Sequence, residues 1–168
     1  MAIEPTSAEG IRASLNRKAL ASARQRSALG RLLGLGDGEV LAIQHLARAG
    51  RMTPSRLGGA LGLSSGGATA LVQRLEREGA VVREPHPHDR RSVLLRLTPE
   101  IEDRAAEALA PLVEEIDALT ARLSDADRSV VGDFLARVAE AADRHADALA
   151  RDTSEPAAAG SPVPGLWA

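Results

Sequence analysis

Residues of two short segments have the side chains and the spacing that contact with a nucleic acid requires. In the first segment, Ser65–Arg74, hydroxyl, amide and guanidinium groups share one face of an expected helix. Hydroxyl groups bond base edges or phosphates, and glutamine can pair with adenine through two hydrogen bonds. A generic solvated polar face is the alternative. The candidate contact residues here, with the cap positions of this helix and of the preceding one, are Thr53, Ser64, Ser65, Thr69, Gln73 and Arg74.

The second segment, Pro85–Arg91, contains two prolines and ends in Asp89, Arg90 and Arg91. An exposed arginine at the end of a stiff hairpin suits a narrow minor groove, whose negative potential attracts a guanidinium. Asp89 is expected to hold one of the arginines in position through a charge-assisted hydrogen bond. His88 completes the candidate contact residues of this segment. A solvated turn with weak surface ion pairs is the alternative.

A pair of helices must position the first segment. Thr53 followed by Pro54 is typical of a helix start, because the hydroxyl caps free N–H groups and proline fits the first helical position. Ser64 is expected to cap a second helix that ends at Gly79, and a tight glycine-containing turn separates the two. This arrangement is a helix-turn-helix. The apolar residues expected to hold its second helix on the core are Ala68, Leu71, Val72 and Leu75.

A β-hairpin must position the second segment. Strand-like runs occupy residues 80–83 and 92–97. The prolines between them are expected to end the ladder, because proline has no N–H to donate. A helix-turn-helix followed by a hairpin is a winged helix, which reads duplex DNA with its second helix in the major groove. The predicted fold class is therefore mainly α with a small β-hairpin, a winged helix-turn-helix lobe with additional helices.

Longer helices flank this lobe on both sides. Apolar spacing predicts a helix over 7–33, and Asp37 is expected to cap another that ends at Gly50. Between Thr98 and Arg151, apolar residues follow a heptad rhythm through two further helices. Such helices need a partner, so a homodimer is expected, with a helical hairpin inside a monomer as the alternative. The candidate dimerisation residues are Ile11, Leu15, Leu112, Ile116, Leu119, Leu135, Val138 and His145.

Charge is unevenly distributed along the 168 residues, although the formal net charge is only −2. Residues 1–50 carry seven basic and four acidic side chains, residues 51–97 carry eight and four, and residues 98–168 carry six and fifteen. The net charges of the three parts are therefore +3, +4 and −9. A basic middle part indicates a polyanionic partner for that part of the chain alone.

The composition also excludes several classes of protein. Without cysteine there is no disulfide, thiolate nucleophile or thiol-based sensor. The absence of an apolar run of about 18 residues and of a signal peptide predicts a cytoplasmic protein without a membrane partner. No phosphate-binding loop or nucleophile–base set is recognisable, so neither an enzyme nor a cofactor is expected. The four histidines, His45, His86, His88 and His145, do not form a metal-ligand set.

The stretch from Leu61 to Thr98 resembles the MarR family of bacterial transcription regulators, most specifically in Asp89-Arg90-Arg91 and the later Leu97-Thr98. The resemblance covers about residues 7–150. It implies a homodimeric repressor on a pseudo-palindromic operator of double-stranded DNA, associated with the nucleoid when bound and released by a small-molecule effector. Ala70 and Gln73 stand where the family often has Arg and Asp, so the operator sequence does not carry over. A winged-helix-derived helical dimer or adaptor that has lost specific DNA binding is the alternative.

These features divide the chain into four parts. Residues 1–6 are expected to be flexible, and residues 37–98 to form the winged helix-turn-helix DNA-binding domain. Residues 7–36 and 99–151 are expected to form a helical dimerisation region. The tail over 152–168, which contains Trp167, is rich in Ala, Pro, Gly and Ser and is expected to be disordered.

Overall fold

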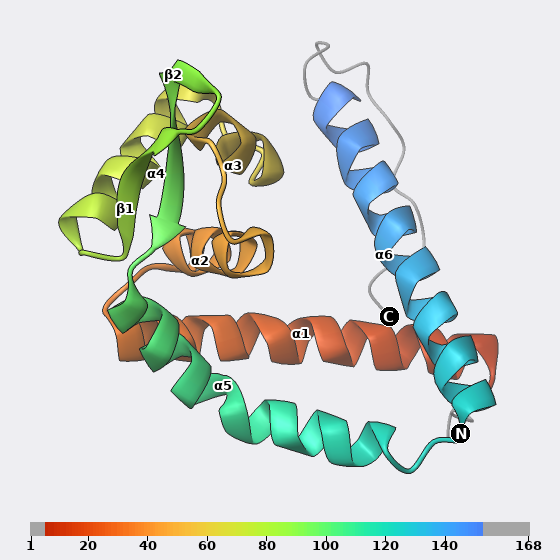
Figure 1. The fold of residues 1–168 in the computed structure, drawn as a ribbon. Coiled ribbons are helices and arrows are strands. Elements are labelled where there is room, and N and C mark those ends of the chain that lie inside the picture. Colours follow the sequence, from red (N-terminus) through yellow and green to blue (C-terminus); the bar gives the residue numbers. More distant parts are fainter. Residues whose placement is uncertain (1–5, 153–168) are drawn as a thin grey trace. The chain divides into compact units, whose positions relative to one another are not determined.

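The computed structural model describes residues 6–152, which form mainly helices and one small antiparallel hairpin that lies beside α4 (Figure 1). The predicted fold class is therefore confirmed. The chain divides into two compact units at the bond between Leu112 and Val113, inside α5. In chain order the elements are α1 (Ala8–Leu33), α2 (Asp37–Ala49), α3 (Pro54–Ala60), α4 (Ser65–Arg77), β1 (Val81–His86), β2 (Asp89–Leu97), α5 (Pro99–Thr120) and α6 (Asp125–Asp152).

The expected flexible start and disordered tail, with Trp167, lie almost wholly outside the described residues. Helix α6 continues through Asp152, which is one residue further than the sequence predicts.

Side-chain hydroxyls begin three of the helices in the first unit, as their types predict. Ser7, Thr53 and Ser64 accept the N–H groups of the residues three positions later, at 3.0, 3.2 and 3.2 Å. Each cap satisfies a backbone donor that the first helical turn leaves free.

The predicted cap of α2 is wrong. Gly36 holds the N-cap position, and Asp37 is the first helical residue. The carboxylate of Asp37 accepts a hydrogen bond from the Ser27 hydroxyl of α1, at 3.0 and 2.9 Å. A tertiary contact between α1 and α2 has therefore taken the side chain that local spacing assigned to the cap.

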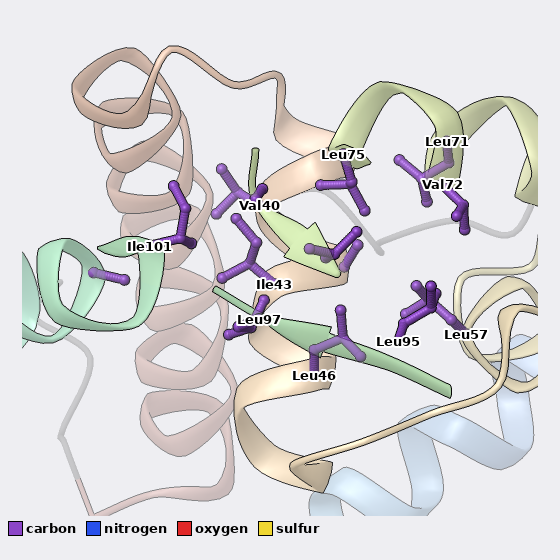
Figure 2. Packing of buried hydrophobic residues seen from close by; sticks show 14 of the residues in the cluster. Val40, Ile43, Leu46, Leu57, Leu71, Val72, Leu75, Leu95, Leu97 and Ile101 are labelled. Atoms are coloured by element: carbon purple, nitrogen blue, oxygen red, sulfur yellow. The ribbon is translucent and has the colours of Figure 1, made fainter. Parts of the chain in front are cut away.

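The hydrophobic core of the first unit joins every element from α1 to the start of α5 (Figure 2). Leu29 and Leu33 of α1, and Ile101 and Ala105 of α5, belong to the same cluster as the winged-helix residues. Burying a leucine, isoleucine or valine side chain contributes roughly 1.5–3 kcal/mol to the stability of the folded state. The largest fully buried side chains are Val40, Leu46, Leu57, Val72, Leu75, Leu95 and Leu97.

The β-hairpin is longer than the sequence predicts. Pro85 pairs with Val93 and His86 with Asp89, so Pro87 and His88 alone form the tip. The expectation that the prolines end the ladder is wrong for Pro85. Strand β1 pairs only with β2, so a residue without an N–H on the outer edge of β1 removes no ladder bond. The regular register ends directly after Pro85, because it shifts between Pro85 and His86.

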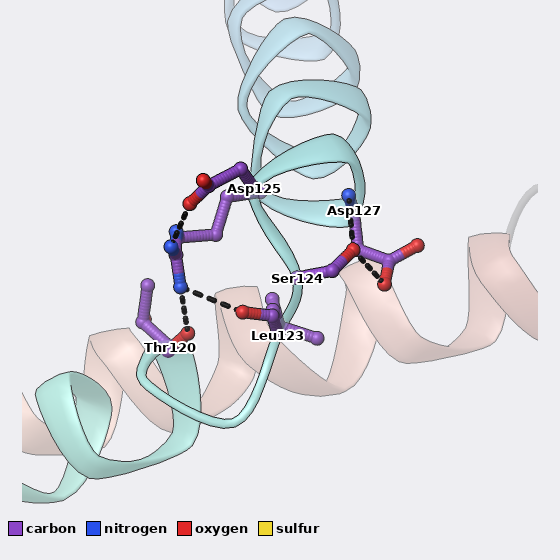
Figure 3. A network of polar contacts seen from close by, with 6 residues as sticks. Thr120, Leu123, Ser124, Asp125 and Asp127 are labelled. Atoms are coloured by element: carbon purple, nitrogen blue, oxygen red, sulfur yellow. Dashed lines mark hydrogen bonds and ion pairs between the residues drawn. The ribbon is translucent and has the colours of Figure 1, made fainter.

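In the second unit, the side chain of Arg128 holds the turn between α5 and α6, and its partners Thr120, Leu123 and Asp125 are labelled in Figure 3. Its Nη1 donates to the carbonyl of Leu123 at 2.6 Å and to that of Thr120 at 3.4 Å, and its Nη2 pairs with Asp125. Carbonyl groups at a helix C-terminus lack partners within the helix, and a guanidinium can supply them. Ser124 caps α6 by accepting the N–H of Asp127 at 3.1 Å.

Candidate nucleic-acid interface

Helix α4 has one buried and one exposed face. The four apolar residues that the sequence assigns to the core are all buried, and they hold α4 against the rest of the first unit. The polar residues Ser65, Thr69 and Gln73 are exposed. The prediction of an amphipathic helix that offers its polar face to solvent is therefore confirmed.

Three of the candidate hydroxyls already make local hydrogen bonds. The Ser64 Oγ accepts the Gly67 N–H, and the Thr69 Oγ1 donates to the carbonyl of Ser65 at 2.9 Å. Thr53 acts in the same way at the start of α3, where its Oγ1 accepts the Arg56 N–H. A hydroxyl oxygen has two lone pairs, so Ser64 and Thr69 can each still accept a further hydrogen bond. Thr53 also shares a hydrogen bond with the hydroxyl of Ser55, at 3.2 Å.

A shallow groove of about 390 Å³ lies along the surface where α3 and α4 meet. Gly58 and Gly59 of α3 form part of it, and Ser65 and Thr69 of α4 line its other side. A Cβ added to Gly58 would lie 2.6 Å from the Cβ of Ala68, so only glycine permits this approach of the two helices. The sequence interpretation missed Ser55, which also lines the groove, although the neighbouring glycine pair was a usable signal.

Close contact also needs a sharp turn between these helices. Gly62 has a φ of 64°, in the left-handed region that a residue with a side chain seldom adopts. The expected glycine-containing turn of the helix-turn-helix is therefore confirmed.

Arg74 lies on the exposed side of α4 but is paired. Its Nε donates to Oε1 of Glu39 at 2.6 Å, which ties α4 to α2. The hydrogen bond from Arg74 lowers the pKa of the Glu39 carboxyl below its ordinary value. The role of Arg74 in contacting DNA stays a prediction.

At the wing, Asp89 positions Arg91 through the backbone. Its Oδ1 accepts the backbone N–H of Arg91 at 2.9 Å, whereas the sequence predicts a hydrogen bond to a guanidinium. Among the described side chains no guanidinium bonds to Asp89, which instead closes a local turn of its own chain. Because the expectation concerned either arginine, it stays a prediction for Arg90. The Arg91 side chain is exposed, and that of Arg90 lies outside the described residues.

The two wing histidines contact each other at the tip. The N–H of His88 donates to Nδ1 of His86 at 3.3 Å, and the rings meet edge to face with centroids 6.3 Å apart. Within the part of the chain that the structure describes, no three metal-ligating side chains come together.

Ion pairs that the sequence interpretation missed fix the wing. Arg83 of β1 donates to both carboxylate oxygens of Glu76 on α4, at 2.6 and 3.1 Å. Glu84 accepts from Arg96 of β2 at 2.8 Å and lies 3.3 Å from Arg51. The bond from Arg96 lowers the pKa of Glu84. The sequence shows that these charged residues are present, but the tertiary fold decides which carboxylate pairs with which guanidinium.

These pairs reduce the number of free cations in the basic middle of the chain. Arg51, Arg74, Arg77, Arg83 and Arg96 each have a glutamate partner. Among its described side chains, Arg56 and Arg91 have no ion pair. The positive charge available to a polyanion is therefore concentrated at fewer positions than the eight arginines of residues 51–97 indicate.

The candidate dimerisation residues lie on α1, α5 and α6. Ile11, Leu15 and Val138 are half-buried, and His145 is exposed. The remaining four, Leu112, Ile116, Leu119 and Leu135, are large hydrophobic side chains that are 40–56% exposed. Within the described residues, no helix is both long enough and apolar enough to cross a bilayer.

Comparison with known proteins identifies the family. The profile of the MarR family matches residues 33–92, from the end of α1 into β2. The HTH-type transcriptional regulator YcgE of Bacillus subtilis is 33% identical over 108 residues, which cover 64% of this chain and 70% of YcgE. The family profile thus matches the winged-helix region, and the alignment with YcgE extends over most of that regulator.

Solved structures of regulators have the same fold as this chain. NadR in complex with 4-hydroxyphenylacetate matches at a TM-score of 0.58 and 27% identity, over 83% of this chain and 98% of NadR. The transcriptional regulator Tm0710 from Thermotoga maritima, at 23% identity, has the same fold, with a TM-score of 0.57 over 83% of this chain and 98% of its own. The prediction that the protein is not an enzyme is confirmed, because the matched family consists of regulators. The chain belongs to the MarR family of DNA-binding, winged helix-turn-helix transcriptional regulators.

Proposed function

We propose that the protein is a dimeric repressor that binds a pseudo-palindromic operator and leaves it when a small-molecule effector binds. The observation that carries the proposal is the division of α4 into a fully packed apolar face and an exposed polar face. A helix held in this way can enter a major groove without losing its contacts with the core.

Direct readout is assigned to the exposed polar residues of α4. Ser65 and Gln73 make no other side-chain hydrogen bond within the described residues, so both can bond base edges or phosphates. Thr69 lies one turn after Ser65 and keeps an acceptor lone pair. These three residues are the proposed sequence-reading set, while Ser64 and Thr53 serve first as helix caps.

The wing supplies the second contact. Arg91 is exposed, has no ion pair within the described residues, and follows a turn that Asp89 closes. The Arg83–Glu76 bonds connect this hairpin to α4, so the two contact elements keep a constant separation. We assign Arg91 to the minor groove, where the phosphates of both strands attract its charge.

Exposed apolar side chains support the dimer. Ile116, Leu119 and Leu135 are half exposed or more, and side chains of this size are stabilised by burial against a second copy. A two-fold dimer presents two copies of α4, which is why the expected operator is pseudo-palindromic.

Control by a small molecule is supported by NadR, whose structure contains 4-hydroxyphenylacetate. An effector can release the operator only if it binds the free arrangement more tightly than the DNA-bound one. Repression is assigned from the family resemblance, and action on a bacterial operator places the protein in the cytoplasm, at the nucleoid when bound.

Binding to duplex DNA from the region flanking its own gene, measured by fluorescence anisotropy at several salt concentrations, tests the proposal. Arg91→Ala should weaken operator binding by about 1–3 kcal/mol if its contact is specific. Arg31→Ala, which removes an exposed arginine of α1, is the control and should bind like the wild type. If the wild type shows no salt-dependent binding to any duplex, the proposal is wrong and the adaptor alternative is favoured.

A further inference from the structure

We infer that Glu84 of β1 is a specificity-determining residue for DNA binding, because it holds Arg51 in an ion pair and so keeps this cation from the phosphates of non-operator DNA. The inference rests on the proposed function, since it concerns the ratio between operator and non-operator affinity. Glu84 itself is assigned no contact with DNA. It acts on binding through the arginines that it neutralises.

Both carboxylate oxygens of Glu84 face arginines from different segments of the chain. Its Oε1 accepts a hydrogen bond from Nε of Arg96 on β2 at 2.8 Å. Its Oε2 lies 3.3 Å from Nε of Arg51, in the connection between α2 and α3. The bond from Arg96 lowers the pKa of Glu84, so this carboxyl is ionised at neutral pH. Glu84 therefore reduces the formal charge of this three-residue cluster from +2 to +1.

The two arginines of the cluster differ in how firmly they are held. Arg96 has a second partner, because its Nη1 donates to the carbonyl of Leu97 at 2.9 Å. The side chain of Arg51 is 56% exposed and has no other ion pair within the described residues. Its backbone stays beside the hairpin, since the next residue, Met52, exchanges backbone hydrogen bonds with Leu95 of β2 at 3.2 and 2.7 Å. Removal of the Glu84 charge therefore frees the side chain of Arg51 and leaves Arg96 attached.

The cluster lies on the same hairpin as Arg91, the residue proposed for the minor groove. Glu84 pairs with Leu94, which is three residues from Arg91 along β2. A strand rises about 3.4 Å per residue, so about 10 Å separates the two positions. This distance is about one Debye length at an ionic strength of about 0.1 M, so a charge freed here acts on phosphates bound near the wing.

One additional free arginine favours non-operator DNA more than the operator. Non-specific affinity comes essentially from phosphates that the protein neutralises, and each of them adds about 0.9 to the salt dependence of log K. On the operator, base contacts fix the position of the protein, so Arg51 gains a phosphate only if one lies within its reach. On other sequences the protein can shift along the duplex until a free cation meets a phosphate. Glu84 therefore increases the ratio of operator to non-operator affinity.

Glu84→Gln tests the inference, because it removes the charge and keeps the length of the side chain. Fluorescence anisotropy measures binding of the full-length protein to its operator and to a duplex of equal length and scrambled sequence, between about 50 and about 200 mM salt. Glu107→Gln is the control, since it removes one exposed acidic residue of α5 and changes the net charge equally. Glu84→Gln combined with Arg51→Gln also removes the freed cation. Circular dichroism establishes that the variants are folded.

Glu84→Gln should bind the scrambled duplex at least about threefold more tightly than the wild type, with a salt dependence of log K that is steeper by about 0.9. Its affinity for the operator should change by less than about twofold, because the base contacts are the same. Glu107→Gln should match the wild type on both duplexes. The double variant should return to the wild-type affinity and salt dependence, which distinguishes the release of Arg51 from a general effect of charge.

Unchanged binding of Glu84→Gln to the scrambled duplex would overturn the inference, and so would an equal gain on both duplexes. A loss of operator affinity alone would assign Glu84 to the support of the wing and would also overturn it. The two proposals fail in different ways. Equal affinity of the wild type for both duplexes would contradict operator recognition, whereas the salt dependence of Glu84→Gln on the scrambled duplex would still show whether Glu84 withholds Arg51.

Discussion

The guanidinium of Arg74 on α4 donates through Nε to Oε1 of Glu39 on α2, at a distance of 2.6 Å. The side chain of Glu39 is only 13% exposed, so solvent screens this pair less than the other ion pairs of α4. The pair fixes α4, which carries the proposed sequence-reading residues, against a helix that also packs on α1.

Glu39→Gln should lower the free energy of unfolding by about 1 kcal/mol at neutral pH, since it removes a charged acceptor while Arg74 stays half exposed. Urea unfolding followed by circular dichroism measures the change. Glu78→Gln is the control, because the Arg77–Glu78 pair joins neighbours in sequence and is exposed on both sides. An equal loss in the two variants would contradict the assigned role of Glu39.

The stabilisation from Glu39 should depend on pH. Arg74 lowers the pKa of this carboxyl in the folded state, so the unfolded chain takes up a proton first as the pH falls. The contribution is therefore complete above the unfolded pKa of about 4.3 and disappears as the pH falls through the folded value. The difference between wild type and Glu39→Gln, measured by urea unfolding, should shrink between about pH 5 and pH 3. A difference that is constant over this range would refute the assignment.

Gly58→Ala should destabilise the protein by about 1–3 kcal/mol, because the new methyl group would overlap the Cβ of Ala68 on α4. Gly59→Ala on the same helix is a matched control, since no atom lies within 4 Å of a Cβ added there. It should stabilise the protein by up to about 1 kcal/mol through helix propensity. Thermal unfolding of both variants measures the contrast, and similar changes in the two would show that α3 and α4 are not closely packed at Gly58.

Arg83→Gln should reduce operator affinity although we assign it no contact with DNA. Its two hydrogen bonds to Glu76 hold the wing beside α4, and a looser wing must be ordered again on binding. An exposed pair of this kind contributes up to about 1 kcal/mol, so a loss of two- to fivefold is expected. Anisotropy titrations of Arg83→Gln and of Arg77→Gln compare a wing contact with a local pair, and only the first should weaken binding.

Ile116→Glu should convert the proposed dimer into a monomer. The loss of about 1.5–3 kcal/mol of apolar burial in each of two protomers weakens association at least a hundredfold. Sedimentation velocity at several concentrations measures the change, with Glu114→Gln on the same helix as control. A variant that remains dimeric at low concentration would show that this part of α5 lies outside the interface.

Local patterns account for most of the secondary structure. The hydroxyls of Ser7, Thr53 and Ser64 start helices because a cap needs only the backbone three residues later. The tertiary fold decided the two exceptions, one through a contact between helices and one through the position of a strand in its sheet. Asp37 bonds to Ser27 in preference to capping α2, and Pro85 stays in the ladder because its strand has a free edge.

The sequence by itself determined the winged helix, the buried and exposed faces of α4, and the exposed wing arginine, because each follows from periodicity or from the chemistry of neighbouring residues. Only the tertiary structure decided which charges are available. It paired Arg74 with Glu39 and Arg83 with Glu76, and it placed Glu84 between Arg51 and Arg96. The physical reason is that an ion pair depends on the distance between two side chains in space, which spacing along one helix or strand does not specify.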